Sequence, residues 1–418
     1  MLTITHKVLW AIATSMILLS SVYYSIKLKW KQFKIFSLFK EIFNKKNKNS
    51  YDALMLTLAG RIGVGSIAGI ALGIYIGGVG TIFWLWVTTF IVSILSYVET
   101  ILGIKYQEKN NVCVGGPSYY IKNGLNNSNL ATLYAILIIV CYVGGFLGIQ
   151  ANTITKGFNS FIVVPNYITA IMLAILTSLC IFRGLNSITK ITSKLVPFMT
   201  IFYLVLCVYV LCVNSTQIPE IICNIFKSAF GIEPITGGII STCIIGLQRG
   251  IFSNEAGLGT GSITSSICDK KDIEKQACLQ VIGVYITSLL ICTATAFFIM
   301  TTDYIDISFT DMNGIELMQQ AFSYHFGCIG ELLLLIFIFL FAFSTILTGY
   351  YYGEAALLFI LKKRNSVMIF ILKLITLIVI LIGCIIKSTT LWLFVDILVS
   401  LLAIINIYAL LKLSYIVK

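Results

Sequence analysis

The sequence predicts an all-α polytopic membrane protein. Hydrophobic residues make up 58% of the 418 residues, whereas charged residues make up only 11%. Apolar runs of about 20 residues, the length a helix needs to cross a bilayer, recur from residue 8 to residue 411. A membrane-spanning barrel would instead show alternating segments of about 10 residues, and the sequence does not have that pattern.

The apolar runs predict eleven membrane-spanning helices. Their approximate bounds are 8–26, 53–76, 80–104, 130–158, 166–183, 194–213, 236–267, 276–301, 328–361, 367–387 and 389–411. The first run resembles a signal peptide in length, but it lacks an evident small-residue cleavage site. Because eight lysines follow it between Lys27 and Lys48, we expect a retained helix with its amino end outside.

Lysine and arginine collect in the loops of one side. These loops contain Lys27 to Lys48, Lys105 with Lys109, Arg183 with Lys190, Lys270 with Lys271 and Lys275, and Lys362 with Lys363 and Arg364. The opposite side includes residues 301–316, which contain acids and no lysine or arginine. Cytoplasmic loops are enriched in Lys and Arg, so we expect the carboxyl end inside the cell. The net charge of +12 therefore reflects topology rather than nucleic-acid binding.

Several other classes of function lack their motifs. The 12 cysteines form no CxxC pair and only two histidines are present, so neither a zinc site nor a disulfide framework is expected. No HExxH sequence and no GxxxxGK[ST] sequence occurs, which argues against an intramembrane metalloenzyme and against transport driven by nucleotide hydrolysis.

Two of the predicted spans are rich in glycine. One contains "LAGRIGVGSIAGIALG" (Leu58 to Gly73) and the other contains "GLQRGIFSNEAGLGTGS" (Gly246 to Ser262). With residues 1–50 set aside as a first helix and basic loop, the transporter core of 51–418 divides into five plus five spans, each half beginning with one of these segments. We expect inverted repeats at about 51–213 and 234–412, as in many secondary transporters.

Clustered glycines predict unwound backbone inside these two spans. Glycine costs about 1 kcal/mol relative to alanine in a helix interior, and the alternative is close helix packing alone. Unwound backbone would present N–H groups to an anion and carbonyls to a cation. A zwitterion such as an amino acid, accompanied by a small cation, would satisfy both.

Polar side chains inside the spans are candidates for function. A charge near the bilayer centre costs about 2.5 to 3.5 kcal/mol, so Arg61, Arg249 and Glu255 should face a cavity or a partner. We hypothesise that Glu255 pairs with Arg61 or Arg249 and holds the two broken helices together, the alternative for Arg249 being solvation near an interface. Glu99 and Glu354 lie nearer the cytoplasmic ends, where solvated or gating roles are open.

Ser344 and Thr345 place adjacent hydroxyls in the ninth predicted span. Such hydroxyls usually bond the carbonyls of their own helix. Hydroxyl and carbonyl oxygens are also the ligands that a small hard cation requires, so both interpretations remain open at this point.

The motifs of this chain resemble those of the alanine or glycine:cation symporter family, over nearly the whole length from Lys27 to Leu411. The matching blocks are "GVGSIAG" (63–69), "GGVGTIFWLW" (77–86), "GGPSYYI" (115–121), "QANTI" (150–154), "KLVPFM" (194–199), "QRGIFSNEAGLG" (248–259), "AFSTIL" with "YYGE" (342–354) and "DILVSLLAIINIYAL" (396–410). The resemblance implies a leucine-transporter-like fold with one extra amino-terminal helix. It also implies cation-driven uptake of small neutral amino acids across the cytoplasmic membrane.

The resemblance also implies site residues. The substrate would contact the backbone of Gly63, Val64 and Gly65 and the side chains of Ser66, Gln150, Phe252, Ser253 and Asn254. Sodium would bind the carbonyls of Ala59 and Ile62 and the hydroxyls of Ser344 and Thr345. These hydroxyls favour Na⁺ as the coupling ion, with protons as the alternative.

Three positions depart from the family pattern. Ser66 stands where the family usually has asparagine, which shortens the reach of that side chain. Gly349 stands where a tryptophan is common. We therefore expect a wider binding space at this wall unless Tyr350 fills it, and the wider space would admit a substrate as large as glutamine. Ile405 replaces a favoured proline and bears on helix geometry.

The leading hypothesis is a symporter for alanine, glycine or glutamine, coupled to Na⁺ and working by alternating access. A channel or sensor that uses the same cavity is the alternative from another class. It would conduct or signal without concentrating its substrate.

Overall fold

The computed structural model describes residues 2–38, 48–110, 112–161, 164–231, 238–302, 314–386 and 388–417. Within these ranges the chain is helical apart from one antiparallel hairpin of strands β1 (Glu108–Asn110) and β2 (Val112–Val114). The predicted all-α class is therefore confirmed. The acidic loop predicted at 301–316 lies mostly outside the described residues.

The helical elements follow one another with short connections. The first part of the chain forms α1 (Leu2–Lys27), η1 (Lys31–Leu38), α3 (Lys48–Arg61), η2 (Val64–Ser66), α4 (Ala68–Gly77), α5 (Thr81–Lys105), α6 (Pro117–Leu125), α7 (Ser128–Ile138), η3 (Ile139–Phe146), α8 (Leu147–Phe161), α9 (Asn166–Ile181) and α10 (Leu185–Val213). The second part forms α11 (Ile218–Ala229), α12 (Gly238–Asn254), α13 (Thr260–Ser265), η4 (Lys270–Asp272), α14 (Ile273–Tyr285), η5 (Ile286–Cys292), α15 (Thr293–Met300), α16 (Gly314–Phe326), α17 (Cys328–Leu361), α18 (Ser366–Gly383), α19 (Ser388–Lys412) and η6 (Ser414–Ile416).

Among the described residues, eight helices are long and apolar enough to cross a membrane, or nine if the bent pair α3 and α4 is one span. The predicted count of eleven is not reached by this measure. The two remaining predicted spans, 166–183 and 236–267, correspond to the 16-residue helix α9 and to the interrupted pair α12 and α13. Neither α9 nor either piece of the interrupted pair reaches the length of about 20 residues that a straight span requires.

Helix α10 begins earlier than the sequence predicts, at Leu185 rather than at residue 194. Polar residues obscure this first part of the helix, but Leu185, Ile188 and Thr192 recur at helical spacing and are all buried. The segment is therefore an amphipathic extension that packs one face against the bundle.

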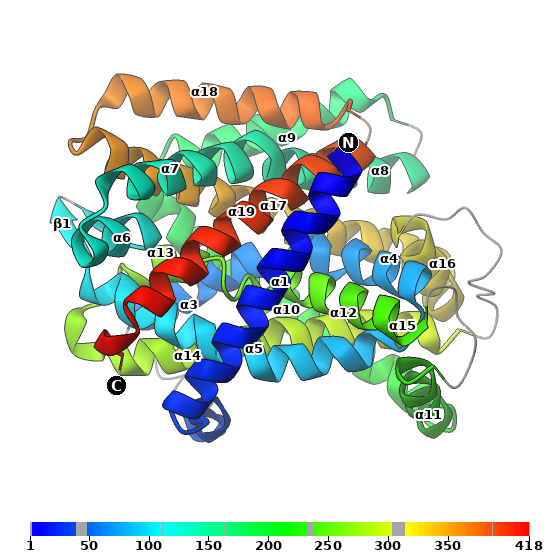
Figure 1. Cartoon of the computed structure of the whole chain (residues 1–418). Coiled ribbons are helices and arrows are strands. Elements are labelled where there is room, and N and C mark those ends of the chain that lie inside the picture. Colours follow the sequence, from blue (N-terminus) through cyan, green and yellow to red (C-terminus); the bar gives the residue numbers. More distant parts are fainter. Residues whose placement is uncertain are drawn as a thin grey trace.

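The two interrupted helices lie inside the bundle. Helix α3 packs against α10, α14 and α17, and α12 packs against α4 and α5. Figure 1 shows α1 crossing the front of the bundle, where it packs along α19 and α5. On the outside, α9, α10 and α18 expose aliphatic side chains such as Ile175, Val205 and Ile378, as expected for surfaces that face lipid.

Candidate functional site

The chain unwinds at both glycine-rich segments. Helix α3 ends at Arg61 and α4 begins at Ala68, with only the short turn η2 between them, and the two parts are bent by 61°. Helix α12 ends at Asn254 and α13 begins at Thr260. Both predicted interruptions are therefore present, and they are called the first and the second break below.

The first break approaches α17 and α12 closely because it is built from glycine. A Cβ atom at Gly63 would lie 2.6 Å from Thr345 Oγ1, and one at Gly65 would lie 3.0 Å from the ring of Phe252. Carbon atoms do not approach neighbours at such distances without displacing them. The glycines therefore let the backbone of the first break contact both neighbouring helices.

Gln150 on α8 joins the first break from the side. Its Oε1 accepts a hydrogen bond from the backbone amide of Val64 at 3.2 Å, and its side chain is fully buried. Its Nε2 is buried and has no partner within the described part of the chain. A buried donor without an acceptor is costly, so this amide is suited to receive an acceptor group from a ligand.

The two breaks meet through serine hydroxyls. Ser66 Oγ lies 2.8 Å from Ser253 Oγ, and Ser253 Oγ lies 3.1 Å from Cys292 Sγ. Phe252 is next to this contact and packs its ring against Phe146 at a centroid distance of 5.4 Å. The structure thus brings together the predicted residues of the first break, Gln150, Phe252 and Ser253.

Two other predicted substrate residues face elsewhere. The Asn254 side chain donates to Ser288 at 3.2 Å and accepts from the amide of Ala256 at 3.0 Å, so it caps the second break. A Cβ atom at Gly349 would lie 2.5 Å from Leu147 Cδ1. Leu147 therefore occupies the space next to Gly349, and the binding space is not wider at this position.

The oxygens predicted to bind sodium partly converge. The Ala59 carbonyl accepts a hydrogen bond from Thr345 at 2.9 Å and a longer one from Ser344 at 3.4 Å. Both hydroxyls also bond the Phe341 carbonyl of their own helix at 2.9 Å. Among the described residues, no hydrogen bond joins the Ile62 carbonyl to these hydroxyls. The converging set consists of uncharged hard oxygens, which suits a monovalent hard cation.

The Glu255 carboxylate is held by hydroxyl groups. It accepts hydrogen bonds from Thr260 at 2.7 Å, Tyr142 at 2.8 Å and Tyr352 at 3.3 Å. Its backbone is left-handed, with φ of 54°, which is uncommon for a residue with a side chain and persists only where the surroundings hold it. Glu255 therefore anchors the second break to η3 and α17.

The predicted ion pair between Glu255 and Arg61 is wrong as a direct contact. Arg61 donates through Nη1 to the Gln280 carbonyl at 3.0 Å and through Nη2 to Ser96 Oγ at 2.8 Å. Helix α3 thus directs Arg61 toward α5 and α14, whereas the turn at Glu255 faces η3 and α17. No ion pair joins the two in the described chain.

The alternative pair, between Glu255 and Arg249, is also not formed among the described residues. The Arg249 guanidinium lies over the ring of Trp392, 5.8 Å from its centroid. A Cβ atom at Gly73 would lie 3.0 Å from Arg249 Cγ. Arg249 therefore connects α12 to α19 through Trp392 and to α4 at Gly73.

Glu99 is a residue of the site whose role the sequence left open. It is fully buried rather than solvated, and its Oε1 accepts from the Gly259 amide at 3.0 Å and from Asn406 Nδ2 at 2.7 Å. Asn406 also donates to the Gly257 carbonyl at 2.9 Å and accepts from the Tyr120 hydroxyl. Glu99 and Asn406 therefore clamp the backbone of the second break. The only signal in the sequence was a glutamate within an apolar helix.

Comparisons with known proteins identify close similarity along the whole chain. The model of the sodium:alanine symporter family matches residues 1–418. The chain is 32% identical to the probable sodium/glutamine symporter GlnT of Bacillus subtilis, over 99% of this chain and 88% of that protein. It is 33% identical to the amino-acid carrier protein AlsT of the same organism, over 94% of this chain and 85% of that protein.

The fold also resembles that of a solved structure. A manganese transporter of Eremococcus coleocola, crystallised as a mutant, matches with a TM-score of 0.59 and 14% sequence identity. The match covers 88% of this chain and 77% of the transporter. At this level of identity the likeness concerns the fold alone.

Proposed function

Because this chain belongs to the sodium:alanine symporter family, we propose that it imports a small neutral amino acid together with Na⁺ across the bacterial cytoplasmic membrane. The family consists of transporters rather than enzymes. The observation that carries the proposal is the meeting of the first break with the hydroxyls of α17 and with the unpartnered amide of Gln150.

We propose that Na⁺ binds between α3 and α17. The ligands would be the Ala59 and Ile62 carbonyls and the hydroxyls of Ser344 and Thr345. The hydroxyl protons of Ser344 and Thr345 now point to carbonyl oxygens, and their remaining lone pairs can bind a cation. Because three of these oxygens already converge from two helices, a bound cation would hold the first break against α17.

The amino acid would bind beside this cation, between the two breaks. Its carboxylate would accept from Gln150 Nε2 and from the amino end of α4, where no side chain of the described residues caps the helix at Ile67. Its ammonium group would face the carbonyls at the end of α3. Gly63, Val64, Gly65 and Ser66 would line one side, and Phe252 and Ser253 the other.

The packing of the helices supports a leucine-transporter-like inverted repeat. In the proposed repeats of 51–213 and 234–412, the second, third and fourth members are α5 with α14, α8 with α17, and α9 with α18. Each packs against its counterpart in the other repeat, as elements near a two-fold axis do. Alternating access would then follow from movement of one repeat against the other.

Alanine, glycine and glutamine are the proposed substrates. The name of the family includes alanine, and glutamine is in the name of the relative GlnT. Leu147 fills the space beside Gly349, so the size of the substrate would depend on Leu147 and on Ser66 rather than on a missing indole. Gly349 would then contact the substrate only indirectly, through Leu147.

The test is uptake of labelled alanine, glycine and glutamine into proteoliposomes with an imposed Na⁺ or proton gradient. We expect concentrative uptake with the Na⁺ gradient. Uptake driven by the proton gradient alone would favour proton coupling. Equal uptake with and without either gradient would contradict symport and favour a channel.

A further inference from the structure

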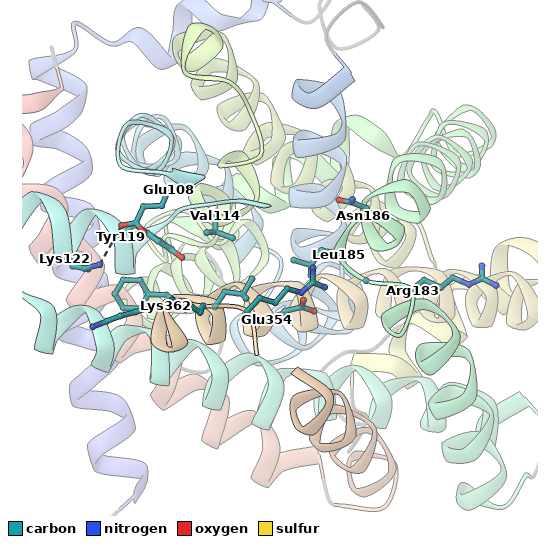
Figure 2. Close-up of a pocket in the computed structure, with 14 residues that line it drawn as sticks. Glu108, Val114, Tyr119, Lys122, Arg183, Leu185, Asn186, Glu354 and Lys362 are labelled. Atoms are coloured by element: carbon teal, nitrogen blue, oxygen red, sulfur yellow. Dashed lines mark ion pairs between the residues drawn. The ribbon is translucent and has the colours of Figure 1, made fainter. Parts of the chain in front are cut away.

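A cavity of about 360 Å³ lies at the basic face of the bundle (Figure 2). Its walls come from the β1–β2 hairpin, α6, the α9–α10 connection and the end of α17, and none of its lining residues belongs to either break. Five basic and two acidic residues line it, namely Lys122, Arg183, Lys362, Lys363, Arg364, Glu108 and Glu354.

Some of these charges are already neutralised or directed elsewhere. Lys122 forms an ion pair with Glu108 at 3.8 Å, the dashed line of Figure 2. The side chain of Arg183 extends away from the cavity in the same view. The charges that remain for a ligand are Glu354 and the cations of the α17–α18 connection, Lys362 to Arg364.

Glu354 is a buried carboxylate without a cationic partner. It is 1% exposed, and it accepts a hydrogen bond of 2.5 Å from the hydroxyl of Tyr350. No ion pair joins it to Arg364 or to either lysine within the described residues. Buried charges are usually paired, and Figure 2 places Glu354 near the middle of the lining residues.

The arrangement favours a ligand that carries both charges. Glu354 would repel a simple anion, and Lys362, Lys363 and Arg364 would repel a simple cation. Tyr119 and Phe359, packed edge to face at a centroid distance of 5.0 Å, add an apolar wall. We propose that this cavity is a second binding site for a small zwitterionic amino acid, with the ammonium group at Glu354 and the carboxylate at the α17–α18 cations.

The site rests on the proposed function, because its ligand is the transported amino acid. Glu354 follows Thr345 on α17 by nine residues, which is about 14 Å at the rise of an α-helix. The second site therefore lies on the side of the transport site toward the basic face, which the loop charges predict to be cytoplasmic. An amino acid bound there would fill the space between the α9–α10 connection and the end of α17, and we expect accumulated product thereby to slow further import.

The test is equilibrium binding of labelled alanine and glutamine to the purified full-length protein in the presence of Na⁺. We expect two phases, with the weaker phase lost or weakened at least tenfold in Glu354→Gln and in Arg364→Gln while the tighter phase persists. Glu331→Gln is the matched control, because Glu331 lies at the other end of α17 and bonds only Ser323 among the described residues. The second measurement is the ratio of uptake into vesicles preloaded with alanine to uptake into empty vesicles. This ratio should be higher in the two cavity variants than in the wild-type protein.

Each outcome decides between the proposals. A single binding phase in the wild-type protein, or a weak phase unchanged in both cavity variants, would overturn the second site and leave the proposed function intact. Displacement of the weak phase by inorganic phosphate at the same concentration as by unlabelled alanine would also overturn it, since the cavity would then be an anion site. Absence of all binding and all gradient-driven uptake would instead contradict the proposed function.

Discussion

Among single residues, Thr345 connects α17 to the first break. A threonine within a helix usually bonds a carbonyl of its own preceding turn, and Thr345 does so at Phe341. It also reaches the Ala59 carbonyl of α3, which belongs to a different element. The bond to its own helix is therefore present, and the role of this hydroxyl as a cation ligand stays a prediction.

We predict that Thr345→Ala raises the Na⁺ concentration needed for half-maximal uptake by about tenfold, which corresponds to ~1.4 kcal/mol. The substitution removes one hard oxygen from the proposed cation site. Thr345→Ser keeps that oxygen and should stay close to the wild-type value. The measurement is the Na⁺ dependence of alanine uptake, and equal Na⁺ dependence in all three proteins would exclude Thr345 as a ligand.

Gln150 is predicted to act on the substrate rather than on the cation. Gln150→Ala removes the unpartnered Nε2 donor, and a hydrogen bond to a charged group contributes about 1.5 to 3 kcal/mol. The KM for alanine should therefore rise by at least about tenfold. Kinetics of alanine uptake at saturating Na⁺ measure this, and a KM within twofold of the wild-type value would contradict the assignment.

Among the helical elements, the first break depends on glycine where it meets α17. Gly63→Ala would bring a Cβ atom to 2.6 Å from Thr345 Oγ1, so we expect loss of most Na⁺-dependent uptake. Gly69→Ala is a matched control in the same segment, because a Cβ there meets nothing within 4 Å. Uptake and the amount of folded protein should be measured for both. Similar activity of the two variants would show that the close approach to α17 is unnecessary.

The second break depends on residues far away in the sequence. Asn406→Ala removes hydrogen bonds to Glu99 and to Gly257, and we expect it to lower stability by about 2 to 3 kcal/mol. Asn214→Ala is the control, because among the described residues the Asn214 side chain donates only to the carbonyl of Val210 on the preceding helix. Thermal unfolding of the purified proteins should show a larger decrease in melting temperature for Asn406→Ala than for Asn214→Ala. Equal decreases would contradict the role of Asn406 in holding the second break.

Sequence reasoning predicted the places of the two breaks but not all of their partners. Glycine at successive turns of an apolar run has a definite energetic cost, so its position indicates unwinding without any tertiary information. The partner of Glu255 could not be found in this way, because the left-handed turn decides which helix its side chain faces. Glu99 and Asn406 are 307 positions apart, and only the folded bundle shows that they meet.

For the whole molecule, the predicted orientation rests on loop charges alone. Cys223 on α11 is exposed and should lie outside the cell, whereas Cys113 on the β1–β2 hairpin should lie inside. In variants that keep only Cys223 or only Cys113 of the 12 cysteines, a membrane-impermeant thiol reagent should label Cys223 in intact cells and Cys113 only after permeabilisation. The reverse pattern would invert the topology and would place the cavity beside Glu354 outside.

Coupling of the two fluxes tests the central claim most directly. Proteoliposomes without any initial Na⁺ gradient are given an inward gradient of alanine, and the uptake of radioactive Na⁺ is followed. If Na⁺ and the amino acid bind together at the first break, the alanine gradient should draw Na⁺ into the vesicles against its own gradient, and Thr345→Ala should weaken this. Alanine entry without any accompanying Na⁺ would contradict coupled transport of Na⁺ and the amino acid.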